Sequence, residues 1–177
     1  AREGMTAEDK TVAREIRKTG LPVILVANKC ESAHLPEGFD EFTALGFGEP
    51  IAISAAHGDG MAEIYERLQK YEPEGEDGSA AEDEEKNLIV AIVGRPNAGK
   101  STLVNKWIGD ERMITGPEPG LTRDSIAIGW SYKGRPVRLV DTAGLRRRAR
   151  VTEKLGKMGG HESLRAIRLA HVVILVV

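Results

Sequence analysis

Cysteine is almost absent from this chain of 177 residues: Cys30 is the single one, so no disulfide can form within the chain. Long apolar runs are absent too, because the longest, at 88–93 and 171–177, are far shorter than the roughly 20 residues that a membrane helix needs. No charged and then apolar N-terminal segment indicates export. We therefore expect neither a disulfide scaffold nor a membrane span, and a cytoplasmic location.

Neither sign of charge dominates the chain, which carries 25 Lys and Arg against 27 Asp and Glu. Along the sequence, however, the net charge is −4 over residues 1–71, −7 over 72–86 and +9 over 87–177. The distribution indicates an acidic linker and a basic surface that could meet a polyanion. A basic surface that is merely solvated would show the same pattern.

Two stretches in which strands alternate with helices flank segment 72–86, which has no apolar residue larger than alanine and is predicted to be a flexible linker. Apolar runs rich in β-branched residues are typical of strands covered on both faces, and their alternation with helices implies a parallel sheet. We therefore predict an α/β fold with a mostly parallel sheet and helices on both faces. The expected strands are 22–27, 51–54, 88–93 and 172–177, with a hairpin of 125–132 and 137–141, and the expected helices are one after the Thr6–Asp9 cap, 61–71, one from Lys100, and 161–170.

A glycine-rich motif follows the predicted strand 88–93. Residues 94–101 match G-x-x-x-x-G-K-[ST] at the start of a predicted helix. In such a loop backbone amides wrap phosphates, the helix N-terminus adds positive dipole, Lys100 reaches the outer phosphates and Ser101 binds Mg²⁺. This context favours a phosphate-binding loop over a chance glycine-rich turn. The predicted loop residues are Gly94, Arg95, Pro96, Asn97, Ala98, Gly99, Lys100, Ser101 and Thr102.

Two later segments suit the same site. An aspartate at a strand end, here Asp141, can hold Mg²⁺ through water, and the amide of Gly144 can meet the terminal phosphate and sense its loss. Thr122 can add a second hydroxyl to Mg²⁺ when a triphosphate is bound. Alone, each would also suit an ordinary turn or a surface threonine. Together they indicate a triphosphate site with Lys100, Thr122 and Gly144 as catalytic groups and with contacts from Asp141, Thr142, Ala143 and Gly144.

Base recognition is predicted ahead of the linker. Asn28 and Glu31 follow one strand, and Ser54 and Ala55 follow the next. An asparagine can bind the oxygen-bearing edge of guanine, and an acid three residues on can accept from its amino and ring N–H groups. Adenine lacks that pattern, so the sequence favours GTP over ATP. The predicted nucleotide contacts are Asn28, Lys29, Glu31, Ser54 and Ala55.

These motifs resemble the Era/TrmE group of P-loop GTPases, and within it the bacterial tandem GTPases of the Der (EngA) family. Segments 94–105, 122–124, 141–147 and 164–167 look like the front half of the second GTPase domain of that family, and segments 1–6, 22–29 and 54–56 look like the back half of its first. The resemblance implies a P-loop NTPase fold, GTP or GDP with Mg²⁺ as ligands, hydrolysis of GTP, and a role in ribosome assembly.

The motif order is circularly permuted within the chain, since the base motifs precede the phosphate loop. The resemblance divides the chain into a back half-domain at 1–71, a linker at 72–86 and a front half-domain at 87–177. In a tandem parent the two half-domains would serve different nucleotides. A circularly permuted single GTPase is the alternative, and a chain of this kind could also fold in the permuted arrangement.

Two positions depart from the common pattern. Glu31 stands where aspartate is usual, and Leu145 stands where Ras-like enzymes carry the glutamine that orients water. Families similar to this one use a K⁺ ion held partly by the loop asparagine, here Asn97, although this residue could simply stabilise the loop. A binding module that is gated by nucleotide and has negligible turnover is therefore the alternative to an enzyme.

Four guanidinium groups follow at Arg146, Arg147, Arg148 and Arg150, in the loop that the terminal phosphate should reorganise. Arginine suits phosphate backbones because it stays charged and binds in a bidentate manner. With the resemblance, this run predicts a nucleotide-gated contact with RNA or protein of the large ribosomal subunit, and no DNA partner. A plain solvated run is the alternative.

Overall fold

A computed structural model describes residues 4–31, 35–71, 88–110, 128–132, 135–140, 167 and 170–177. The predicted linker 72–86, the predicted helix 161–170 apart from residues 167 and 170, and residues 125–127 and 141 of the predicted hairpin lie outside this part. Within it, no helix is both long and apolar enough to cross a membrane.

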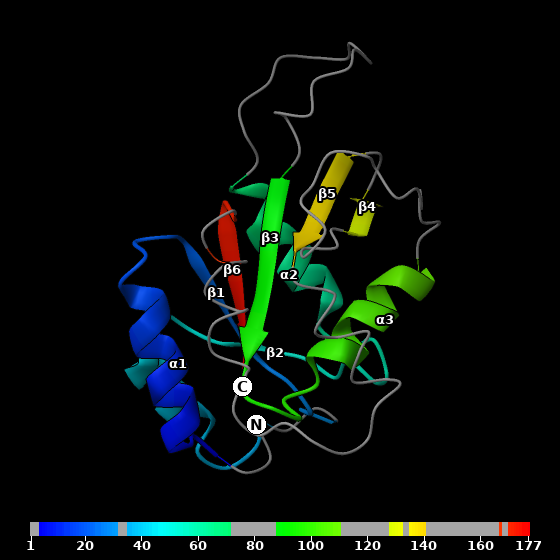
Figure 1. Cartoon of the computed structure of the whole chain (residues 1–177). Helices are drawn as coiled ribbons and strands as arrows, with labels where there is room; N and C mark the ends of the chain where they lie inside the picture. Colours follow the sequence, from blue (N-terminus) through cyan, green and yellow to red (C-terminus); the bar gives the residue numbers. More distant parts are fainter. Residues whose placement is uncertain are drawn as a thin grey trace, which may run out of the picture.

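Six strands form a single sheet in the order β2-β1-β6-β3-β5-β4 (Figure 1). Neighbouring strands are parallel except β4 and β5, which form the predicted antiparallel hairpin. The predicted α/β fold with a mostly parallel sheet is therefore confirmed. The strands are β1 (Val23–Ala27), β2 (Ile51–Ala52), β3 (Leu88–Gly94), β4 (Ile128–Tyr132), β5 (Arg135–Val140) and β6 (Val172–Val176).

The two stretches on either side of the linker meet in this sheet through β6. This strand pairs with β3, from Val90 opposite Val172 onward, and with β1, from Val23 opposite Val173 onward. The base motifs and the phosphate loop thus follow strands of one sheet in this chain, and their order along the sequence is permuted. Whether residues 1–71 and 87–177 belong to two successive domains of a longer protein stays a prediction.

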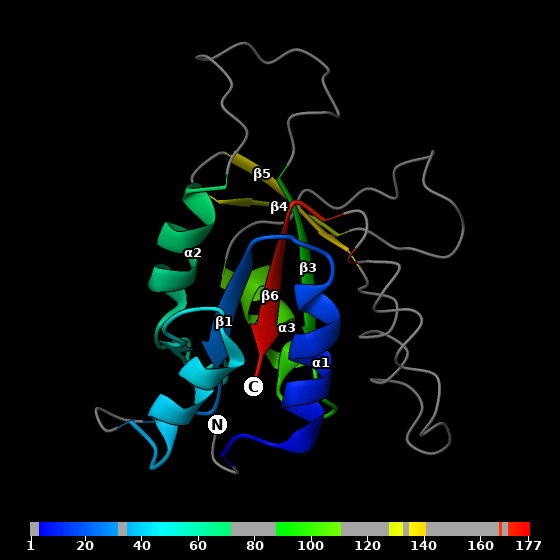
Figure 2. The same ribbon diagram turned by 90° about the vertical axis from the view of Figure 1, so that its left-hand side faces the viewer.

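Helices cover both faces of the sheet, as predicted (Figure 2). Helix α1 (Ala7–Arg17) and the 3-10 helix η1 (Phe39–Leu45) pack on one face, and α2 (Met61–Gln69) and α3 (Lys100–Asp110) pack on the other. The capping box predicted at the start of α1 is present, because the side chain of Thr6 accepts from the backbone N–H of Asp9 and the carboxylate of Asp9 accepts from the backbone N–H of Thr6.

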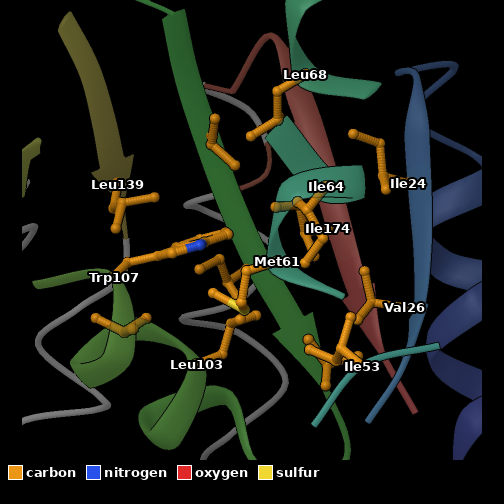
Figure 3. Packing of buried hydrophobic residues seen from close by; sticks show 14 of the residues in the cluster. Ile24, Val26, Ile53, Met61, Ile64, Leu68, Leu103, Trp107, Leu139 and Ile174 are labelled. Atoms are coloured by element: carbon orange, nitrogen blue, oxygen red, sulfur yellow. The ribbon is translucent and has the colours of Figure 1, made fainter. Parts of the chain in front are cut away.

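The larger of the two apolar clusters lies between the sheet and helices α2 and α3 (Figure 3). Trp107 of α3 is 1% exposed, and its ring centroid lies 6.0 Å from that of Tyr65 on α2. Ile64 and Leu68, four residues apart on α2, are both buried, as their spacing predicts. The cluster fixes the start of α3 beneath the carboxyl end of β3, where the phosphate loop lies.

Strand β2 is shorter than the predicted strand 51–54. Ile53 still donates its backbone N–H to the carbonyl of Ala27, but Ser54 instead pairs with Asp59 in an isolated antiparallel bridge. The carbonyl of Ser54 accepts from the backbone N–H groups of residues 57, 58 and 59. This tight turn takes the chain off the sheet two residues early.

Candidate nucleotide site

The predicted phosphate loop lies at the carboxyl end of the central strand β3 and leads directly into α3. The backbone N–H of Leu103 donates to the carbonyl of Gly99 at 2.9 Å, so the helix begins inside the motif. Asn97 and Gly99 have φ of 63° and 99°. A Cβ at Gly99 would overlap the side-chain amide of Asn28, so a larger residue would not fit there. The first turn of α3 has no acidic residue, so no carboxylate of that turn offsets the positive dipole at the helix start.

The ammonium group of Lys100 is held over the loop. Its Nζ donates to the carbonyl oxygen of Gly94 at 2.8 Å and to that of Arg95 at 2.6 Å. Both acceptors precede the helix, so the side chain folds back across the loop instead of extending away from the protein. A cation fixed in this position attracts an anion that the amides at the helix start can bind.

Asn28 joins the base motif to the phosphate loop. Its side chain is 3% exposed and lies just beyond the end of β1. Nδ2 donates to the carbonyl of Ala98 at 2.8 Å, while Oδ1 accepts from the backbone N–H of Ala55 at 3.1 Å and of Lys29 at 2.8 Å. Three of the predicted segments, 28–31, 54–55 and 94–101, are therefore brought together by one side chain.

The remaining residues of the base motif surround this bridge. Glu31 is exposed, and Lys29 is exposed with a positive φ of 64°. Ser54 is buried and its hydroxyl lies 2.8 Å from Nδ1 of His57. Cys30 is buried beneath the loop, where burial raises the pKa of its thiol. A buried neutral thiol at this point packs as a small side chain and offers little thiolate for chemistry.

Several predicted site residues lie outside the described part of the chain. They are Thr122, Asp141, Thr142, Ala143, Gly144, Leu145, Arg146, Arg147, Arg148 and Arg150. Strand β5, which precedes residues 141–150, pairs Val140 with Ala91, three residues before the phosphate loop begins at Gly94. Within the described residues no three His, Cys, Asp or Glu side chains form a metal-binding group.

One contact at the loop was missed by the sequence analysis. Nε of Arg95 lies 3.4 Å from Oδ1 of Asp9, whose side chain is fully buried at the start of α1. The sequence signalled Asp9 only as a capping residue and Arg95 only as a loop residue. Because 86 positions separate the two, no local pattern could have paired them.

A glycine-rich loop between a central parallel strand and the start of a helix, backed by the asparagine that follows β1, two strands along the sheet, defines an α/β nucleotide-binding domain of the P-loop class. Residues 89–177 match the family described as "50S ribosome-binding GTPase", which is half of the chain. The chain belongs to this family.

Individual relatives agree with that assignment. The chain is 45% identical over 200 residues to GTPase Der of Rhizobium etli CFN 42 and 52% identical over 181 residues to GTPase Der of Bradyrhizobium sp. BTAi1. It is 47% identical over 199 residues to GTPase Der of Parvibaculum lavamentivorans. Each alignment covers 99% of the chain but only 40–42% of the relative, so the chain spans about two fifths of the length of these proteins. The predicted resemblance to the Der family is confirmed.

Proposed function

We propose that the chain binds a guanine nucleotide together with Mg²⁺ at the carboxyl edge of the sheet, and that the protein to which it belongs hydrolyses GTP and acts in assembly of the large ribosomal subunit. The observation that carries the nucleotide site is the bridge made by Asn28. A base bound near residues 28–31 and phosphates bound at 94–101 then belong to a single ligand, because one buried side chain holds both loops in place.

The residues present fit a magnesium-bound nucleotide. Lys100 already lies across the loop, the first turn of α3 is free of carboxylates, and Gly99 keeps the backbone clear of side chains where Asn28 approaches. Ser101 would ligate the metal, with Thr122 and Asp141 completing its protein contacts. When bound, Mg²⁺ neutralises charge on the phosphate oxygens. Glu31 and Asn28 would select guanine, and the backbone of Ala55 would line the base.

Hydrolysis requires that charge developing on the phosphates be stabilised. Lys100 supplies one positive charge, and the amide of Gly144 would bind the terminal phosphate. Leu145 has no group that can hydrogen-bond to water, so we assign part of the stabilisation to K⁺ held by Asn97, which is exposed on the loop. A monovalent cation there would supply positive charge beside the phosphates, as an arginine finger does in other GTPases.

Ribosome contact is assigned to the basic run at Arg146, Arg147, Arg148 and Arg150. The family description and the net charge of +9 over residues 87–177 support a polyanionic partner such as ribosomal RNA. Reversing all four charges to Glu should weaken binding to large subunits at least tenfold in a sedimentation assay and leave GDP affinity unchanged. Unchanged subunit binding would remove this assignment.

Nucleotide binding is tested with a fluorescent GDP analogue on the 177-residue chain, with unlabelled GTP, GDP and ATP as competitors. We expect GTP and GDP to compete and ATP not to. Lys100→Ala should abolish binding, because the loop loses its cation. The matched control is Lys18→Ala, which removes a lysine from an exposed pair with Glu15. No binding by the unmodified chain, or equal competition by ATP, would refute the proposed site.

Hydrolysis is tested on the full-length protein in single-turnover reactions with and without large subunits, in K⁺ and in Na⁺. The K⁺ assignment predicts faster turnover in K⁺ and loss of that difference in Asn97→Ala. Equal rates in the two salts would refute the role of K⁺. Negligible turnover under all conditions would refute the proposed hydrolysis and favour the alternative, a binding module that is gated by nucleotide.

A further inference from the structure

A fully buried carboxylate on α1 faces the phosphate loop, although α1 precedes the predicted linker in the sequence and the loop follows it. The side chain of Asp9 is 0% exposed and that of Arg95 is 12% exposed, and Oδ1 of Asp9 lies 3.4 Å from Nε of Arg95. The acid belongs to the acidic stretch 1–71 and the guanidinium to the basic stretch 87–177. A carboxylate removed from water requires a partner charge, so the two groups hold each other in place.

Asp9 cannot follow Arg95 if the loop moves. Its second oxygen, Oδ2, accepts from the backbone N–H of Thr6 at 2.9 Å and from the hydroxyl of Thr6 at 2.7 Å. The first of these bonds belongs to the capping box, and α1 is packed against the sheet by Ala13 and Ile16. The carboxylate is therefore a fixed point to which the loop is attached.

Arg95 connects that fixed point to the phosphate-binding cation. Its side chain reaches Asp9, while its carbonyl oxygen accepts from Nζ of Lys100 at 2.6 Å and from the backbone N–H of Ala98 at 3.4 Å. A shift of Arg95 would move the acceptor that places Lys100 and would loosen the turn at Ala98. We propose that Asp9 is a positioning residue for the phosphate loop, acting through Arg95 to hold Lys100 and the loop backbone in the geometry that binds phosphate.

This inference rests on the proposed nucleotide site for its effect on affinity, but its effect on the loop can be measured without nucleotide. The first measurement is amide hydrogen exchange of residues 95–103 in the nucleotide-free chain. The second is affinity for a fluorescent GDP analogue. The variants are Asp9→Asn, which keeps the acceptor for the capping box but removes the charge, Arg95→Met, and the double variant.

The matched control is Thr6→Val. It removes the hydroxyl that accepts from the backbone N–H of Asp9 and donates to Oδ2, but it keeps the backbone N–H of Thr6 on Oδ2 and the charged carboxylate facing Arg95, so the helix cap is weakened while the ion pair remains. If Asp9 acts only as a helix cap, Asp9→Asn and Thr6→Val will have the same effects. If Asp9 positions the loop, Asp9→Asn will change exchange at 95–103 and nucleotide affinity far more than Thr6→Val does, because only Asp9→Asn removes the charge that holds Arg95.

We expect Asp9→Asn to accelerate loop exchange and to weaken GDP binding about tenfold to hundredfold, the range for a displaced binding group. In the Arg95→Met background Asp9→Asn should have no further effect on either measurement, since the connection is already lost. The double variant carries neither charge and keeps the chain foldable where a single variant leaves one charge buried alone.

Wild-type exchange and affinity in the double variant would overturn the inference, as would an Asp9→Asn effect that persists in the Arg95→Met background. If the unmodified chain binds no nucleotide while Asp9→Asn still accelerates loop exchange, the proposed function fails and the positioning role stands. If nucleotide binds but neither measurement responds to Asp9→Asn, the positioning role fails alone.

Discussion

Truncation of Asn28 to alanine would remove the side chain that joins three loops of the site. Asn28→Ala deletes the donor to Ala98 and the acceptor from Ala55, both of which are buried residues, and the acceptor from Lys29, which is exposed. A buried partner left without its hydrogen bond costs about 1–3 kcal/mol, whereas an exposed one regains water. Two buried partners predict a loss of about 2–6 kcal/mol in the free energy of unfolding.

That loss is a large part of the about 5–15 kcal/mol that stabilises a typical domain, so the variant should fold but unfold at much lower denaturant. The assay is urea unfolding followed by tryptophan fluorescence, to which Trp107, buried in the core, contributes. The control is Asn105→Ala, an exposed asparagine on α3, which should change stability by less than about 0.5 kcal/mol. If both variants lose equally little, the bridge between the two motifs does not contribute to the fold and the reasoning fails.

Three other substitutions or treatments test the site and its surroundings. Gly60, with φ of 76°, has no room for a Cβ beside the carbonyl of Ala52, so Gly60→Ala should lower the free energy of unfolding by at least about 1–3 kcal/mol in urea, whereas Gly109→Ala, in open space on α3, should not lower it. Glu31→Ala should reduce the preference for GDP over inosine diphosphate, which lacks the amino group, by about tenfold or more; an unchanged preference would exclude the carboxylate from base recognition. Because burial raises the pKa of Cys30, less thiolate is present near neutral pH, and iodoacetamide should modify the folded chain far more slowly than the urea-unfolded chain. In the folded chain the modification rate should begin to rise at a higher pH than it does for an ordinary thiol. Equal rates for the folded and unfolded chains would show that the thiol is accessible.

Local features of the site were predictable because short-range patterns encode them. The spacing of glycines and Lys100 defines a loop-to-helix turn, and the Thr6–Asp9 pattern defines a helix start. Apolar runs identified β1, β3 and β6, since burial on both faces demands them. The hairpin was also predicted, but β5 begins at Arg135, two residues before the predicted start. The short β2 was overestimated because the turn that follows depends on a carbonyl accepting three N–H groups, which residue types do not reveal.

Long-range pairings were less accessible to sequence reasoning. Alternating strands and helices predict a parallel sheet, but many strand orders satisfy that pattern, and the position of β6 between β1 and β3 follows from register over long separations. The family resemblance indicated that the two halves of the chain could fold together as one GTPase domain with a permuted motif order, as this sheet does. The pairing of Asp9 with Arg95 had no such guide, because each residue already had a sufficient local explanation.

The position of β6 has a consequence for how the chain folds. Val26 pairs with Ile51 and Leu88 with Val137, whereas β6 joins β3 at Val90 opposite Val172 and joins β1 at Val23 opposite Val173, 150 positions away. Closing a longer loop costs more entropy, and distant pairings slow folding. We therefore expect each half to form its own pairings first and the two halves to dock last. Because Asn28 meets Ala98 only after docking, a bound nucleotide should slow unfolding and leave the folding rate almost unchanged.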